Sequence, residues 1–80
     1  MVMVVGGYPI VDHLVWHPAI DMQLLAGTRD GAITIWDVSK QVATARHACH
    51  KPLRCVAYNP AGTLLATAWG ERDANITVYN

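Results

Sequence analysis

The chain is built from short apolar runs of four to eight residues, each bounded by Pro, Gly, Asp or Asn. The runs are rich in Val, Ile, Leu and Thr, a composition that is typical of β-strands. They predict strands over residues 2–5, 11–16, 24–28, 32–36, 41–47, 54–58, 64–68 and 75–79. No run has the length and period of a helix, so we predict an all-β fold.

Two turn signals and one strand pattern add detail to this expectation. Asp30-Gly31 lies between two apolar runs and predicts a hairpin, and Pro60-Ala61-Gly62 predicts a second turn. Residues 24–28 and 64–68 do not alternate between apolar and polar side chains. We therefore expect both faces of these two strands to be covered.

The chain also contains an internal repeat. Three segments return in the same order, 29–37 as 72–80, 15–18 as 57–60 and 24–26 as 64–66, at offsets of 43, 42 and 40 positions. The changing offset indicates an insertion of Trp69-Gly70-Glu71 in the second copy, in a connection between strands, where insertions are tolerated. A period near 42 residues with four short strands per unit is typical of a repeat architecture.

This repeat, with Trp36-Asp37 at the end of its third strand, resembles the WD-repeat family of β-propellers. The resemblance implies a single segment, residues 1–80, of two blades that are four-stranded antiparallel sheets. It divides the chain into an outer strand at 1–5 that completes a blade, a first repeat at about 8–47 and a second at about 48–80. Within the family, His17-Pro18 and the charged insertion resemble the closing blades of messenger-RNA-export and spindle-checkpoint propellers.

The resemblance also implies a buried hydrogen-bond network in each blade. Its members are a His, a hydroxyl residue, an Asp and the signature Trp, and neither repeat has all four. The matching positions are Tyr8, Thr28, Asp30 and Trp36 in the first repeat, and His50, Asp73 and Tyr79 in the second, where Ala68 stands at the hydroxyl position. Because an incomplete buried network leaves polar groups without partners, we expect each blade to depend on water or on its neighbours to satisfy them.

Composition narrows the possible functions. The apolar share of 52% and the charged share of 15% exclude a disordered chain. A net charge of zero argues against binding to nucleic acid or to a membrane surface, because both depend on an excess of Lys and Arg. The two cysteines, Cys49 and Cys55, are too few and too close for a disulfide framework, so we expect reduced thiols and an intracellular location, cytoplasmic or nuclear.

Neither a metal site nor catalysis is predicted. The candidate metal ligands are His13, His17, His47, Cys49, His50 and Cys55. His13 and His17 lie four positions apart on one strand, roughly 13 Å, which is too far to share a tetrahedral ion. Ser39 is the only serine and has no nucleophile elbow around it, and no glycine-rich phosphate loop occurs. We expect no cofactor, no metal and no enzyme activity.

Binding of a protein or peptide is the remaining class, and the resemblance implies a scaffold that presents loops at one end of the blades. The expected contact residues are Arg29, Lys51, Trp69, Glu71 and Arg72. Trp69 fits equally well as a cap on the blade core, and the recurring Arg29 and Arg72 fit equally well in structural ion pairs. Two blades expose two apolar faces, so we expect other blades as partners, from a longer chain or from identical copies. The alternative function is a building block whose copies close into a symmetric ring.

Overall fold

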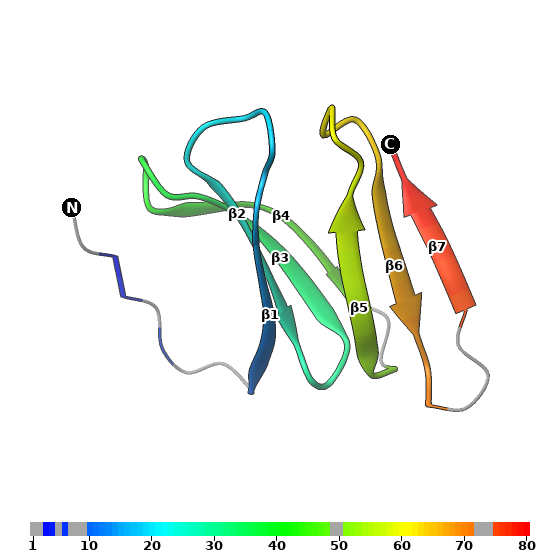
Figure 1. Ribbon diagram of the computed structural model, residues 1–80. Helices are drawn as coiled ribbons and strands as arrows, with labels where there is room; N and C mark the ends of the chain where they lie inside the picture. Colours follow the sequence, from blue (N-terminus) through cyan, green and yellow to red (C-terminus); the bar gives the residue numbers. More distant parts are fainter. Residues whose placement is uncertain (1–2, 5, 7–9, 49–50, 72–74) are drawn as a thin grey trace.

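The computed structural model describes residues 3–4, 6, 10–48, 51–71 and 75–80, and within them it contains strands and no helix (Figure 1). The strands are β1 (Val11–Trp16), β2 (Gln23–Thr28), β3 (Ala32–Asp37), β4 (Val42–Ala48), β5 (Leu53–Tyr58), β6 (Leu65–Trp69) and β7 (Asn75–Tyr79). Each coincides with a predicted strand to within one residue at either end. The all-β prediction is confirmed.

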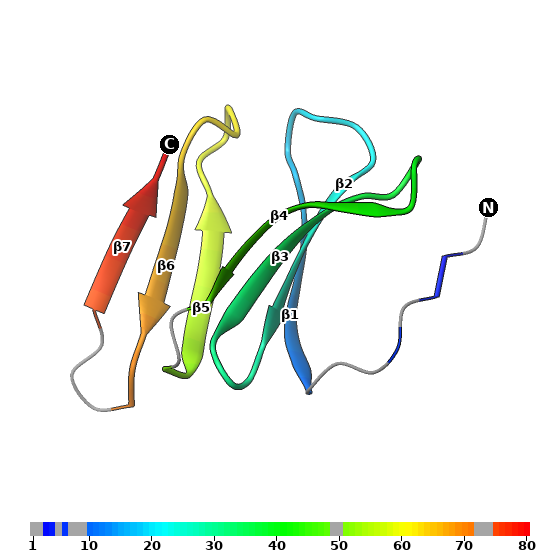
Figure 2. The same cartoon turned by 180° about the vertical axis from the view of Figure 1, so that it is seen from behind.

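The strands form two antiparallel sheets that stand side by side. The first sheet has the order β1-β2-β3-β4 and the second has the order β5-β6-β7. Figures 1 and 2 show the two sheets from opposite sides, with β7 at one end of the molecule. The molecule is therefore flat, with extents of 40 × 32 × 15 Å. The strand that follows Trp36-Asp37, β4, completes the first sheet as its outer strand.

The N-terminal strand expected at residues 2–5 is not found. Met3 and Val4 lie outside any strand, and Val2 and Val5 are outside the described residues. A strand needs a free sheet edge, and the free edge of the three-stranded sheet is at β7, whereas Met3 lies against the first sheet. Met3 and Val4 therefore do not form the outer strand of the second sheet.

The hydrophobic core lies between the two sheets. Leu25 and Ile33 of the first sheet pack there with Leu53 and Trp69 of the second, and all four are nearly inaccessible to solvent. Partly buried side chains from both sheets surround this cluster, namely Val15, Ile35, Val56, Tyr58 and Leu65. A Cβ atom on Gly27 would collide with the terminal methyl group of Leu53, so a larger residue there would force the Leu53 side chain to move.

The register of the strands corrects the predicted alignment of the two repeats. Leu24 lies opposite Trp36 in the first sheet, and Leu65, not Leu64, lies opposite Tyr79 in the second. Leu24 therefore corresponds to Leu65, 41 positions later, and the predicted offset of 40 is wrong by one residue. The error arose because both repeats carry a Leu-Leu pair, whereas cross-strand pairing decides which leucine faces which side.

The expectation that both faces of the non-alternating strands are covered holds on one face only. In β2, Leu25 and Gly27 are buried against the second sheet. Leu24 and Ala26, on the other face, are only partly buried. Each sheet thus buries one side in the shared core and leaves most of the opposite side open, although Thr28 and Thr34 on that side of the first sheet are buried.

Candidate functional site

The connections that were expected to present binding residues lie together at one end of the strands. Residues 29–31 join β2 to β3, residues 51–52 precede β5, and residues 70–71 follow β6. Figure 1 shows these three connections at the lower end of the sheets. We call the surface formed by these residues the loop end.

Backbone contacts fix the loops of the two sheets to each other. Gly31 has a φ of 100°, and a Cβ atom there would lie 2.1 Å from the backbone oxygen of Lys51. Within the second sheet, the N–H of Gly70 donates a hydrogen bond of 2.9 Å to the backbone oxygen of Pro52, which joins the loop after β6 to the loop before β5. The loop end is therefore one connected surface to which both repeats contribute.

Arg29 is exposed at the loop end but is already paired. Its Nε and Nη2 atoms donate hydrogen bonds of 3.1 Å each to the two carboxylate oxygens of Asp12 on β1. The Arg29 guanidinium lowers the pKa of Asp12 below its ordinary value, and the hydrogen bond to Asp12 raises the pKa of Arg29. The structure thus shows the ion pair that the repeated arginine suggested, and Asp12 is a partner that the sequence did not reveal.

Lys51 and Glu71 are exposed in their loops and lie at the loop end with Arg29. They carry opposite charges and come from connections on either side of β5 and β6. Arg72, the expected contact residue that directly follows the insertion, is outside the described residues. Three of the five predicted contact residues are therefore exposed at one end of the molecule.

Trp69 is not a surface residue, which corrects its prediction as a binding residue in an inserted loop. It is the last residue of β6, its exposed fraction is 2%, and it belongs to the core. Its indole Nε1 donates a 2.7 Å hydrogen bond to the hydroxyl of Thr67, which is equally buried. The alternative, in which Trp69 closes the blade core, is what the structure shows.

The network residues of the first repeat are partly assembled. The hydroxyl of Thr28 donates to the Asp30 carboxylate at 2.5 Å and accepts from the N–H of Ala32 at 3.2 Å, which fixes the β2–β3 turn. Trp36 lies half-buried on β3, on the face that carries Thr28. Tyr8 lies outside the described residues.

In the second repeat, the strand register changes the expected network. Trp69, not Ala68, occupies the place that Thr28 has in the first sheet, because Val11 lies opposite Thr28 and Leu53 lies opposite Trp69. The half-buried Tyr79 packs edge to face against the His47 ring at 5.3 Å. The expected members His50 and Asp73 lie outside the described residues.

Two histidines join the sheets, a role that the sequence did not reveal. His13 Nε2 donates to the backbone oxygen of Leu53 at 3.0 Å, and His17 Nε2 donates to that of Gly62 at 2.9 Å. The only signal in the sequence for these contacts was that His17 and Asn59 precede a proline at matching repeat positions.

Among the described residues no group of three potential metal ligands occurs. Cys55 is a free, exposed thiol, and Cys49 lies outside the described residues.

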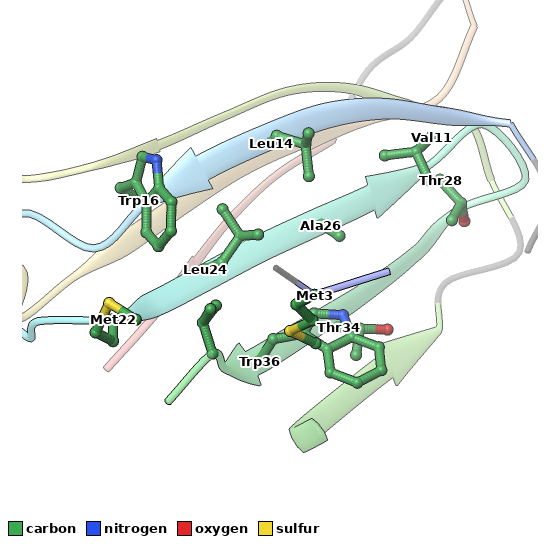
Figure 3. Close-up of a pocket in the computed structure, with 11 residues that line it drawn as sticks. Met3, Val11, Leu14, Trp16, Met22, Leu24, Ala26, Thr28, Thr34 and Trp36 are labelled. Atoms are coloured by element: carbon green, nitrogen blue, oxygen red, sulfur yellow. The ribbon is translucent and has the colours of Figure 1, made fainter. Parts of the chain in front are cut away.

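The side of the first sheet that faces away from the second carries an apolar hollow of about 580 Å³ (Figure 3). It is lined by Met3, Val11, Leu14, Trp16, Met22, Leu24, Ala26, Thr28, Thr34, Trp36 and Val38. Figure 3 shows side chains of the adjacent strands β1, β2 and β3 together with Met3, which comes from the segment before β1; Met22 and Val38 lie just outside the ends of β2 and β3. The lining holds hydroxyl groups but no charged side chain, so the hollow suits apolar packing and not acid–base or phosphate chemistry.

Two small antiparallel sheets that share a core and repeat one strand pattern define a pair of propeller blades. A family model described as WD domain, G-beta repeat, matches residues 39–80, which is just over half of the chain. The chain therefore belongs to the WD-repeat family. The match starts before β4 and ends after β7, so the family unit joins the outer strand of one blade to the inner strands of the next.

The other comparisons are negative. No curated protein and no solved structure matches the chain. The family match does not support the narrower resemblance to messenger-RNA-export and spindle-checkpoint propellers. In the described part of the chain, no helix is long and apolar enough to cross a membrane.

Proposed function

We propose that this chain is a non-catalytic scaffold whose loop end captures a protein or peptide partner. WD repeats generally act as scaffolds for protein interactions. The cytoplasmic or nuclear location expected from the sequence is part of this proposal. The observation that carries it is the geometry of the loop end, where the Gly31 turn of the first blade lies against the backbone of Lys51 and the Gly70–Pro52 hydrogen bond joins the two loops of the second blade.

The charges at this end favour a segment that carries both acidic and basic groups. Lys51 and Glu71 are exposed with opposite charges, whereas the charge of Arg29 is largely satisfied by Asp12. Loops on a rigid sheet scaffold lose little conformational entropy on binding, which favours recognition of an extended peptide. In this proposal Lys51 and Glu71 make the contacts, and Arg29 fixes the first loop.

The test uses a phage-displayed peptide library selected on the immobilised chain. The dissociation constant of a selected peptide is then measured for Lys51→Glu with Glu71→Lys, a double variant that reverses both charges and keeps the net charge. The matched control reverses two exposed charges at the opposite end, Lys40→Glu with Asp21→Lys. We expect at least tenfold weaker binding for the first variant and less than twofold for the control. Equal affinities would remove the loop end from the binding site.

A further inference from the structure

Each sheet leaves one apolar face exposed. The open face of the first sheet carries two rows of directly opposed residues, Trp16, Leu24 and Trp36, and Leu14, Ala26 and Thr34. Of these, Thr34 is buried at the side of the face where Met3 lies, whereas Trp16 and Leu14 are exposed. The open face of the second sheet carries Ala57, Ala66 and Val78, and Cys55, Ala68 and Ile76. Trp16 is 59% exposed and Ile76 is 78% exposed. Exposed apolar surface of this kind marks a contact with another protein surface.

We propose that these two faces bind each other between copies of the chain, so that the open face of the second sheet of one copy packs on the open face of the first sheet of the next. This is a heterologous, head-to-tail contact, because it uses two different surfaces. It repeats the geometry by which the two sheets already pack within one chain. The proposal is independent of partner binding at the loop end.

The registers show which residues of the two contacts correspond. Equivalent positions are separated by 42 residues between β1 and β5, by 41 between β2 and β6, and by 43 between β3 and β7. Within the chain, the row of Val15, Leu25 and Ile35 packs in one core with Tyr58 and Leu65. In the proposed contact, that row is replaced by the equivalent row of the second sheet, Ala57, Ala66 and Val78. It faces the row of the next copy's first sheet, which consists of Trp16, Leu24 and Trp36.

Side-chain sizes change in opposite directions on the two faces. On the first open face, Trp16 and Trp36 are larger than their counterparts Tyr58 and Tyr79. On the second open face, Ala57 and Ala66 are smaller than the valine and leucine at the equivalent positions, and Val78 is smaller than the equivalent isoleucine. The extra volume of the side chains on the first open face is therefore matched by the smaller side chains on the second, as close packing requires.

At the end of the strands near the loops, side-chain sizes also change in opposite directions on the two faces, but here the residue on the second open face is the larger one. Within the chain, Gly27 makes room for Leu53, whose side chain would collide with any Cβ atom there. In the proposed contact the glycine position holds Ala68, which is larger, and the leucine position holds Val11, which is smaller. Two independent size changes thus fit the two open faces to each other and not to a copy of the existing interface.

Polar contacts do not recur between copies. The positions of His13 and His17, which donate hydrogen bonds across the existing interface, are held by Cys55 and Asn59 in the second repeat. The side chain of Asn59 is already bonded within its own turn, to Thr63 and to the N–H of Leu64. The contact between copies therefore rests on apolar packing. Because it joins separate chains, its formation depends on protein concentration.

The test is the native mass of the intact chain and of two charged variants, measured by native mass spectrometry and light scattering at roughly 10–100 μM, a range that spans ordinary weak to moderate association. Trp16→Glu blocks the first open face, and Ile76→Glu blocks the second. Ala61→Glu, in an exposed turn, is the matched control. Circular dichroism checks the β-structure of every sample. If either variant fails to fold, Leu14→Lys and Val78→Lys replace them in the same design.

We expect the unmodified chain and the control to form a discrete oligomer of two to four copies, which corresponds to about four to eight blades. Each blocked variant is expected to be a monomer. Mixing the two variants restores one contact, because each keeps the face that the other lacks, and gives a one-to-one dimer. The proposal is overturned by a folded, monomeric unmodified chain, by an oligomer or aggregate that persists in both variants, or by a mixture of folded variants that stays monomeric.

Discussion

His17 donates a hydrogen bond of 2.9 Å from Nε2 to the backbone oxygen of Gly62, which ties the turn after β1 to the turn before β6. Its other ring nitrogen, Nδ1, accepts hydrogen bonds from the N–H groups of Ala19 at 3.0 Å and Ile20 at 2.8 Å. Because Nδ1 accepts and Nε2 donates, the imidazole is held as the neutral Nε2–H tautomer. One side chain thus shapes a turn of the first blade and fixes it to the second.

Replacing His17 by alanine is expected to weaken the contact between the blades. The substitution leaves the Gly62 oxygen and two backbone N–H groups without their partner and removes the ring that packs edge to face on Tyr58 at 4.7 Å. We expect a loss of about 1–3 kcal/mol in the free energy of unfolding, measured by urea denaturation at a fixed protein concentration. Lys40→Ala, in an exposed turn, is the control and should change it by less than about 0.5 kcal/mol.

Gly62 gives a second prediction that isolates this contact. It has a φ of 75°, and a Cβ atom there would lie 2.2 Å from Cε1 of His17. Gly62→Ala should therefore destabilise the protein by more than the roughly 1–2 kcal/mol that a left-handed backbone conformation costs an ordinary residue. In the His17→Ala background the collision is absent, and the cost of Gly62→Ala should fall to that backbone value. Additive effects in this double-mutant cycle would contradict the contact.

The strands could be predicted from the sequence because their pattern is local. Polar and apolar residues alternate over residues 75–79, and this run coincides with β7. The Asp30-Gly31 turn lies between the end of β2 and the start of β3. The alignment of the repeats could not be predicted to the residue. Leu64 and Leu65 are identical side chains, and only the pairing of Leu65 with Tyr79 across the sheet decides which of them faces the core.

The contacts between the blades were also beyond the sequence. His17 and Gly62 are 45 positions apart, and neither belongs to a motif that would have joined them. The second repeat is longer than the first at the end of β6, so the sequence pattern does not show where the strand ends, and Trp69 is predicted in the loop although it is the last residue of β6. Predicting either feature requires the packing of one sheet on the other, which no pattern within a single repeat encodes.

Trp69 and Thr67 make a third prediction, on the stability of the core. The indole is buried and donates a 2.7 Å hydrogen bond to the Thr67 hydroxyl, which in turn donates to the backbone oxygen of Thr77 at 3.3 Å. Trp69→Ala should cost about 3–5 kcal/mol because it leaves a large cavity between the sheets. Thr67→Val keeps the volume but leaves the indole N–H without its acceptor, and should cost about 1–3 kcal/mol.

The same urea measurement distinguishes the core role of Trp69 from a surface role. If Trp69→Ala lowered the free energy of unfolding by less than about 1 kcal/mol, the value typical of a surface position, the indole would not be part of the core. The Thr67→Val effect should also disappear in the Trp69→Ala background, because the hydrogen bond it breaks is then already absent. A Thr67→Val cost that is the same in both backgrounds would contradict that hydrogen bond.

The ion pair of Asp12 and Arg29 makes the final prediction, on pH dependence. The hydrogen bond from Arg29 lowers the pKa of Asp12 in the folded state. A carboxylate with a lowered folded-state pKa stabilises the fold fully above its ordinary pKa, near pH 4, and this contribution is lost as the pH falls through the folded value. Asp12→Asn should therefore be less stable than the unmodified chain at pH 7, and the difference should shrink below about pH 4.

Salt separates this ion pair from a general effect of the substitution. Both side chains are exposed, with fractions of 64% for Arg29 and 30% for Asp12, so the destabilisation at pH 7 should be small and should decrease in about 1 M NaCl, where charges are screened within about 3 Å. Asp21→Asn removes an exposed carboxylate at the opposite end of the molecule and serves as the control. Equal pH profiles for the two variants would mean that Arg29 does not stabilise the Asp12 carboxylate in solution, and that the ion pair does not hold the first loop of the loop end in place.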